Sequence, residues 1–300
     1  MKKMHIVAFI ALMASQASAS AALKVFACEP EWGALAGKLG GASVTVYTAT
    51  TAKQDPHHIE ARPSLIAKVR SADLIVCTGA ELEVGWLPLL LRQAGNGRVQ
   101  PGSAGYFNAA DHVRLREVPT RLDRSEGDIH PAGNPHIQTD PRNISRVAQA
   151  LAQRLAQLDP ASATLYQARY RDFSRRWSAA LARWKSQAKP LKGISVVTEH
   201  KNWTYLFDWL GMHEVASLEP KPGVPPSAAY LARVLEELKQ RPARMVIYAA
   251  YQDPRPALWL SKRTSMPAVE LPFTVGGTPQ AGDLFELFDD TLRRLLQAVP

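Results

Sequence analysis

The sequence predicts an α/β protein with two lobes, each a small parallel sheet flanked by helices, joined by one long α-helix. Three observations support this fold class. Short apolar strand-like runs alternate with helical segments in residues 20–158, and the alternation restarts after Gly193. Between these regions, residues 159–189 keep a helical period of large apolar side chains. A chain of 300 residues is long enough for two lobes with cores of their own.

The first lobe is predicted from residues 20–158. Its predicted strands are 23–28, 42–47 and 72–77, and its predicted helices are 31–39, 63–69, 83–94 and a fourth that begins at Pro141. This fourth helix has an acid at its N-cap, Asp140, and proline at its first position, which are strong start signals. Residues 95–135 interrupt the alternation and are rich in Gly, Pro, Asp and Arg, and so long an irregular segment indicates a functional or mobile region.

The long helix is predicted for residues 159–189, because Asp159-Pro160 repeats the start signal and Pro190 ends the pattern. Its roughly 30 residues would span about 45 Å, a suitable length for a spine between two lobes, and this predicts small lobe motion. Its aromatic stripe is interpreted as core, with a partner-binding face as the alternative. The second lobe is predicted from residues 190–300. Its predicted strands are 194–198, 245–249 and 268–271, and its predicted helices are 203–210, 227–240, 255–265 and 283–299.

Residues 1–19 have the pattern of a secretory signal peptide, in which two lysines and an apolar run precede Ala17-Ser18-Ala19. We therefore expect an exported, periplasmic protein. A lipid anchor at Cys28 is not expected, because Lys24 interrupts the apolar run before it. The net charge of +9, from 36 basic and 27 acidic residues, is scattered along the chain, which favours a solvated surface over nucleic-acid binding.

The two cysteines, Cys28 and Cys77, both lie in predicted strands of the first lobe. In an oxidising compartment they can pair. The sequence does not fix the distance between their Cα atoms, so a disulfide and two buried thiols both stay open.

Histidines are the candidate metal ligands, and they fall in three places. These are His57 and His58 between Asp55 and Glu60, His130 and His136 at the end of the irregular segment, and His200 after a strand. Each place is a loop or the carboxyl end of a strand, the edge at which open α/β sheets bind ligands. A cleft between the lobes could therefore collect a metal site. Such a nitrogen-rich site suits zinc, whereas manganese would favour more carboxylate. No hydrolase, nucleotide-binding or metalloprotease motif is present, so no catalytic residue is assigned.

Three motifs resemble those of the zinc- and manganese-binding solute receptors of bacterial ABC importers, the cluster with a rigid long helix. The motifs are Asp-Pro-His-x-x-Glu at 55–60, Asn-Pro-His at 134–136 and Val-Thr-x-His at 197–200. The resemblance implies that His57, His136 and His200 are metal ligands and that Zn²⁺, with Mn²⁺ less favoured, is the transported substrate. It also implies a monomer that delivers the ion to an ABC permease in the inner membrane, with a metallochaperone as an optional further partner.

The sequence departs from the family at the fourth ligand. The family usually has Asp or Glu in the loop before the last helix, and residues 271–277 contain neither. Water, Glu60 or Asp283 could complete the site, and Glu60 could instead orient a histidine. His58 is expected to face outward, and the pair Asp128 and His130 either passes metal inward or forms a turn, the turn being preferred. Two other functions stay open: a zinc metalloenzyme with an open three-histidine site, and a receptor for an iron chelate or haem.

Overall fold

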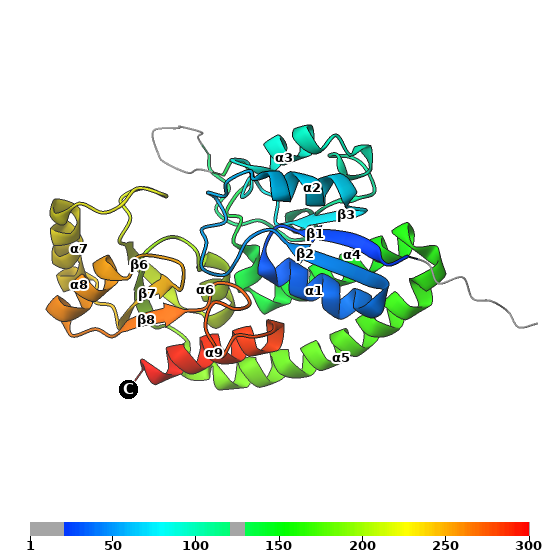
Figure 1. Cartoon of the computed structure of the whole chain (residues 1–300). Coiled ribbons are helices and arrows are strands. Elements are labelled where there is room, and N and C mark those ends of the chain that lie inside the picture. Colours follow the sequence, from blue (N-terminus) through cyan, green and yellow to red (C-terminus); the bar gives the residue numbers. More distant parts are fainter. Residues whose placement is uncertain (1–20, 121–129, 300) are drawn as a thin grey trace, which may run out of the picture.

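The computed structural model describes residues 21–120 and 130–299. Within these ranges the chain forms two four-stranded parallel sheets, each flanked by helices, and one long helix runs beneath both (Figure 1). The predicted fold class is therefore confirmed. The predicted signal peptide, residues 1–19, and Asp128 lie outside the described residues. None of the helices in the described part of the chain is long and apolar enough to cross a bilayer.

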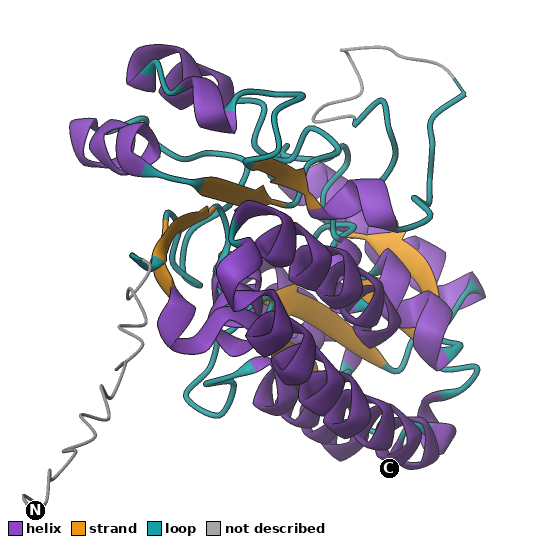
Figure 2. Cartoon of the chain, turned by 90° about the vertical axis from the view of Figure 1, so that its right-hand side faces the viewer, coloured by secondary structure: helices purple, strands orange, loops and turns teal. Residues whose placement is uncertain are grey.

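The first lobe has the strand order β2-β1-β3-β4. Its strands are β1 (Leu23–Ala27), β2 (Val44–Thr48), β3 (Leu74–Cys77) and β4 (Tyr106–Asn108), and its helices are α1 (Pro30–Gly40), α2 (Pro63–Ser71), α3 (Leu87–Ala94) and α4 (Pro141–Leu158). Helices α2 and α3 cover one face of the sheet, and α1 and α4 cover the other (Figures 1 and 2). All carboxyl ends of these parallel strands therefore point to one edge.

The second lobe repeats this arrangement with the order β6-β5-β7-β8. Its strands are β5 (Ser195–Thr198), β6 (His213–Ser217), β7 (Met245–Ala249) and β8 (Ala268–Leu271), and its helices are α6 (Thr204–Leu210), α7 (Ala228–Gln240), α8 (Arg255–Thr264) and α9 (Leu284–Gln297). The first strand in sequence, β5, is again central, because it pairs with β6 on one side and with β7 on the other. Both sheets thus have the same chain path.

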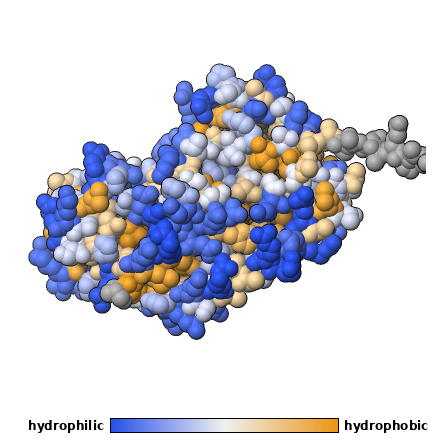
Figure 3. Space-filling model, turned by 60° about the horizontal axis from the view of Figure 1, so that its bottom comes forward, coloured by the Kyte–Doolittle hydropathy of each residue, from blue (hydrophilic) through white to orange (hydrophobic). Residues whose placement is uncertain are grey.

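The connecting helix α5 (Ala163–Gln187) has 25 residues. It is shorter than predicted at its start, because residues 160–162 form a 3₁₀ turn before the α-helix begins. At 1.5 Å per residue it spans about 37 Å. Its aromatic stripe is core, as predicted: Phe173, Trp177 and Trp184 are buried, and the Trp177 indole donates to the carbonyl of Pro141 in α4. Figure 3 shows a mostly hydrophilic surface on the lower side of the molecule, where α5 lies.

Two strands were not predicted from the sequence. β4 has only three residues, and β6 reads His-Glu-Val-Ala-Ser, with no apolar run to mark it. The helix predicted from residue 83 begins only at Leu87, because the chain first makes tight turns in which Gly79, Ala80 and Glu81 all have positive φ. The strand predicted from residue 42 begins at Val44, after a 3₁₀ turn.

The lobes share packing beyond α5. One hydrophobic cluster continues from β1 through α5 to α9 and includes Val25, Trp177 and Leu287. The buried hydroxyl of Thr274, in the loop after β8, donates to the carboxyl group of Glu31 at the start of α1. Because the core is continuous, the boundaries at residues 158/159 and 189/190 stay predictions.

Candidate metal centre

Three histidines from both lobes meet at one point. Ring nitrogens of His57, His136 and His200 all lie within 4.8 Å of one another. His57 lies in the loop between β2 and α2, His136 precedes α4, and His200 follows β5. The carboxyl edges of the two sheets face each other here, which explains why residues so distant in sequence converge.

His57 is oriented by the acid two residues before it. Its backbone N–H donates to Asp55 Oδ1 at 3.0 Å, and its ring Nδ1 lies 2.7 Å from the same oxygen. This small turn directs Nε2 away from the loop and toward the other histidines. Below it, the indole N–H of Trp86 donates to the carbonyl of Pro56 at 2.9 Å, so the loop rests on a buried aromatic ring.

His136 is fully buried, and Asn134 of its motif holds its backbone in place. The backbone N–H of His136 donates to Asn134 Oδ1 at 2.9 Å. The side-chain amide of Asn134 donates to the carbonyl of Lys201, and the hydroxyl of Tyr205 donates to the backbone carbonyl of Asn134. Asn134 thereby links the His136 segment to the second lobe next to His200.

His200 has a carboxylate partner that the sequence did not reveal. Its Nδ1 lies 2.6 Å from Glu219 Oε2, which follows β6. Its Nε2 lies 3.4 Å from Nε2 of His136. Glu219 was missed because β6 was missed: only the pairing of β5 with β6 brings residue 219 beside residue 200.

Burial keeps His136 in the form that can bind a cation. The pKa of His136 is held well below its usual value, first by burial and then by the charges that His57, His200 and His130 would carry. Neutral imidazole is the form that ligates metal. His136 therefore stays available as a ligand at pH values at which an exposed histidine would be protonated.

The structure brings a further histidine to the same point. Nε2 of His130 lies 3.3 Å from Nε2 of His57, and its ring centroid is 6.5 Å from that of His136. His130 also begins a turn, because the N–H of Gly133 donates to the carbonyl of His130 at 3.0 Å; the other member of the predicted pair, Asp128, lies outside the described residues. His130 therefore both forms a turn and lies beside His57.

Neither acid considered for the fourth ligand position is arranged for that role. Asp283 caps α9 by accepting from the N–H groups of Phe285 and Glu286, and it pairs with Lys38 at 3.6 Å. The side chain of Glu60 is exposed, and the carboxylate that orients His57 belongs to Asp55 instead. In the loop before α9, the Phe273 ring packs edge-on against His136 at 5.4 Å between centroids.

Two cavities lie beside the histidines. One of about 340 Å³ is lined by His57 and His200, and its acidic residues are Asp55, Glu199, Glu219 and Asp253. The other, of about 230 Å³, is lined by His130, His136 and His200. The pKa of Glu199 is raised to about 8, mainly by burial and then by the charges of Glu219 and Asp253. Glu199 is therefore largely protonated at neutral pH, whereas Asp55 and Asp253, whose pKa values are lowered by hydrogen bonds to neighbouring groups, supply negative charge that attracts cations.

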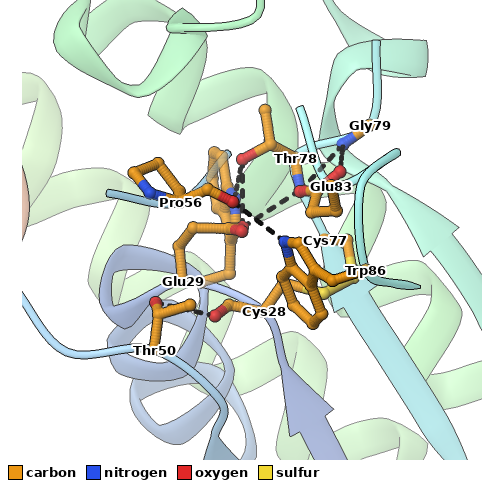
Figure 4. Close-up of a disulfide and its surroundings, with 10 residues drawn as sticks. Cys28, Glu29, Thr50, Pro56, Cys77, Thr78, Gly79, Glu83 and Trp86 are labelled. Carbon is orange, nitrogen blue, oxygen red and sulfur yellow. Dashed lines mark hydrogen bonds between the residues drawn. A yellow bond between two sulfur atoms is a disulfide. The ribbon is translucent and has the colours of Figure 1, made fainter. Parts of the chain in front are cut away.

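The disulfide between Cys28 and Cys77 braces the first lobe below the His57 loop. It links the end of β1 to the end of β3, with Cα atoms 4.8 Å apart, and settles the question that the sequence left open. Figure 4 shows the Trp86 indole next to the disulfide, with its N–H directed at Pro56. The disulfide and the His57 loop thus share one buried neighbour, Trp86.

Three buried glutamates lie close to this disulfide. Glu83 accepts from the N–H groups of Thr78 and Gly79, and Glu29 accepts from Thr78. Burial raises the pKa of Glu83 to about 7 and that of Glu31 to about 7. The pKa of Glu29 is also raised, first by burial and then by the charges of Glu83 and Glu31.

Solved structures share the fold of this chain. One, titled "Crystal structure of ZnuA", aligns with a TM-score of 0.76 at 20% identity over 93% of this chain and 100% of that chain. Another, the Mn-bound periplasmic metal binding protein from Candidatus Liberibacter asiaticus, aligns with a TM-score of 0.75 at 18% identity, over 93% and 100%. At these identities the likeness establishes the fold.

Relatives identify the class. The chain is 24% identical over 257 residues to the metal ABC transporter substrate-binding lipoprotein SloC of Streptococcus mutans, covering 82% of this chain and 80% of that protein. It is 23% identical over 224 residues to the high-affinity zinc uptake system protein ZnuA of Yersinia pestis, covering 68% and 67%. The class is therefore that of extracytoplasmic metal-binding components of ABC transporters. Within it, the chain belongs to the family of the zinc-uptake complex component A, periplasmic, whose profile matches residues 25–298.

Proposed function

We propose that this receptor captures Zn²⁺ and delivers it to the membrane permease of its ABC transporter. The observation that carries the proposal is the convergence of His57, His136 and His200 within 4.8 Å, on loops of both lobes. Imidazole nitrogen is a preferred ligand of zinc, whereas manganese favours carboxylate and water. Because relatives are named for zinc and for manganese alike, the donor set of this chain is the better guide to its metal.

The acids beside the histidines support a receptor rather than a metalloenzyme. Asp55 and Glu219 each contact the Nδ1 atom of a histidine, so they orient ligands and are not directed at an attacking water. No catalytic residue is therefore assigned. A receptor for haem or an iron chelate is disfavoured, because the two cavities beside the histidines are small, about 230 and 340 Å³.

The cellular setting is part of the same proposal. A signal peptide at residues 1–19 would export the protein to the periplasm without a lipid anchor, and a monomer would then meet its permease at the inner membrane. A metallochaperone could load it. The buried disulfide supports this setting, because disulfides persist in oxidising compartments.

The test is to replace His57, His136 and His200 together with alanine and to measure Zn²⁺ affinity by competition with a chelator. We expect tight zinc binding to be abolished. His213→Ala is the matched control, because His213 is an exposed histidine at the start of β6 and should leave affinity unchanged. Nanomolar affinity in the folded triple variant, with folding verified by circular dichroism, would overturn the assignment.

A further inference from the structure

The loop before Asn134 carries a histidine that reaches the metal centre, and the three-histidine assignment does not use it. We propose that His130 is the fourth ligand, so that four imidazole nitrogens enclose the cargo and select Zn²⁺ over Mn²⁺. The inference rests on the proposed function of the three-histidine site, and it replaces the carboxylate expected in the loop before α9.

Two pairs of ring nitrogens are spaced as ligands of one zinc ion would be. Two imidazoles bound to one tetrahedral Zn²⁺ at 2.0–2.1 Å must have their nitrogens roughly 3.3–3.4 Å apart. The Nε2 atoms of His57 and His130 are 3.3 Å apart, and those of His136 and His200 are 3.4 Å apart. Each of these two pairs has the length of one edge of a ZnN₄ tetrahedron. The nitrogens that all lie within 4.8 Å of one another are those of His57, His136 and His200, so binding of the ion would draw His130 toward His136 and His200.

The lone pairs on Nε2 of His57 and His200 face the other histidines. Nδ1 of His57 lies against the Asp55 carboxylate, and Nδ1 of His200 lies against that of Glu219. A carboxylate accepts the Nδ1 proton, so each of these rings keeps a lone pair on Nε2, facing the other histidines. A cation between the nitrogens stabilises this arrangement.

Backbone hydrogen bonds fix the turn that carries His130. The N–H of Gly133 donates to the carbonyl of His130 at 3.0 Å, and the N–H of Asn134 donates to the carbonyl of Arg116 at 2.8 Å. Gly133 has φ +116°, and a Cβ there would lie 2.6 Å from the carbonyl oxygen of Arg116. The same short segment therefore delivers both His130 and His136 to the site.

The carboxylates next to the histidines already contact ring nitrogens. Asp55 and Glu219 contact the outer nitrogens of two ligands, and the Phe273 ring lies against His136 in the loop where the family usually has a carboxylate. The Phe273 ring and the His130 imidazole thus take the place of a hard oxygen ligand, and such an oxygen ligand would favour manganese. Four nitrogens match the preference of zinc.

The experiment compares His130→Ala with His58→Ala, which removes an exposed histidine from the neighbouring loop. Zinc affinity is measured by chelator competition, and imidazoles around the bound zinc are counted by X-ray absorption. We expect His130→Ala to weaken Zn²⁺ binding by roughly two orders of magnitude and to lower the imidazole count from four to three. His58→Ala should change neither quantity. The ratio of Zn²⁺ to Mn²⁺ affinity should fall in His130→Asp, which supplies an oxygen donor.

The wild-type spectrum decides the question even if a variant folds poorly. Three imidazoles and an oxygen around zinc in the wild-type protein would overturn the role of His130. Unchanged affinity and an unchanged count in His130→Ala would do the same. Either result leaves the three-histidine receptor intact, whereas failure of the proposed function would appear as zinc binding that survives the triple alanine variant.

Discussion

In the first lobe, the histidines lie on loops that leave the sheet, and a disulfide and a buried tryptophan support the loop of His57. In the second lobe, His200 follows directly after the central strand β5 and is held by Glu219 at the end of the neighbouring strand. The two sheets have the same strand order and the same parallel chain path. The difference is that the candidate ligand His57 lies on a loop above a braced scaffold, whereas the candidate ligand His200 lies at a strand end beside one carboxylate.

The largest expected effect comes from removing that brace. Replacing Cys28 and Cys77 with serine opens a link between residues 49 apart in sequence, which should cost about 4 kcal/mol of unfolding free energy. Chemical denaturation measures the loss. Hydrogen exchange locates it, and we expect β1 and β3 to lose more protection than β5 and β7.

The comparison between the lobes would fail in two ways. An unchanged unfolding free energy would show that the disulfide is not a brace. Equal loss of protection in both sheets would show that the continuous core, rather than the individual lobe, is the cooperative unit.

Local signals explain what the sequence could predict. Two of the three proposed ligands are held by local neighbours in short motifs: Asp55 orients His57 two residues away, and Asn134 positions His136 two residues away. Such turns can be read from a few letters. Most strand and helix positions could also be predicted, because the apolar periods are strong and Pro or Gly residues mark their ends.

Contacts between distant segments explain what the sequence could not predict. Glu219 reaches His200 only because β6 pairs with β5, and β6 lacks an apolar run. His130 lies in an irregular segment where spacing carries no geometric information, so a turn was the natural interpretation. The sequence showed that the loop containing Phe273 lacks the carboxylate that the family usually has there. Only the folded structure shows which side chain lies against His136 in its place.

A second prediction uses the buried glutamates of the first lobe, Glu29, Glu31 and Glu83. A carboxyl group whose folded pKa is raised binds its proton more tightly in the folded state. Its stabilising contribution is complete below about pH 4.5 and is lost as the pH rises to about 7, the pKa of Glu83 and Glu31. The wild-type protein should therefore lose stability across this window from these groups.

Glu29→Gln should remove part of that pH dependence. The neutral amide keeps an oxygen that accepts from Thr78 and removes a like charge from Glu83. We expect the variant to be more stable than wild type at pH 8 and nearly equal at pH 5, because the raised pKa of Glu29 disfavours its charged form only above the unfolded-state pKa. Thermal unfolding at both pH values measures this, with the exposed Glu60→Gln as control. A variant less stable than wild type at pH 8 would contradict the raised pKa.

The smallest expected effect sharpens the comparison of the two lobes at the ligands themselves. Glu219 and Asp55 both contact Nδ1 of a histidine, but the Glu219 side chain is 17% exposed and that of Asp55 is 39% exposed. The more buried charge is less screened by water, and it stabilises the metal-bound imidazole more strongly. Glu219→Gln should therefore weaken Zn²⁺ binding by roughly 10- to 100-fold, and Asp55→Asn by less, because such partners typically contribute within that range. Chelator competition on folded variants measures both. Equal losses, or a larger loss for Asp55→Asn, would show that the bond from the His57 backbone to Asp55, rather than the carboxylate charge, determines ligand strength in the first lobe.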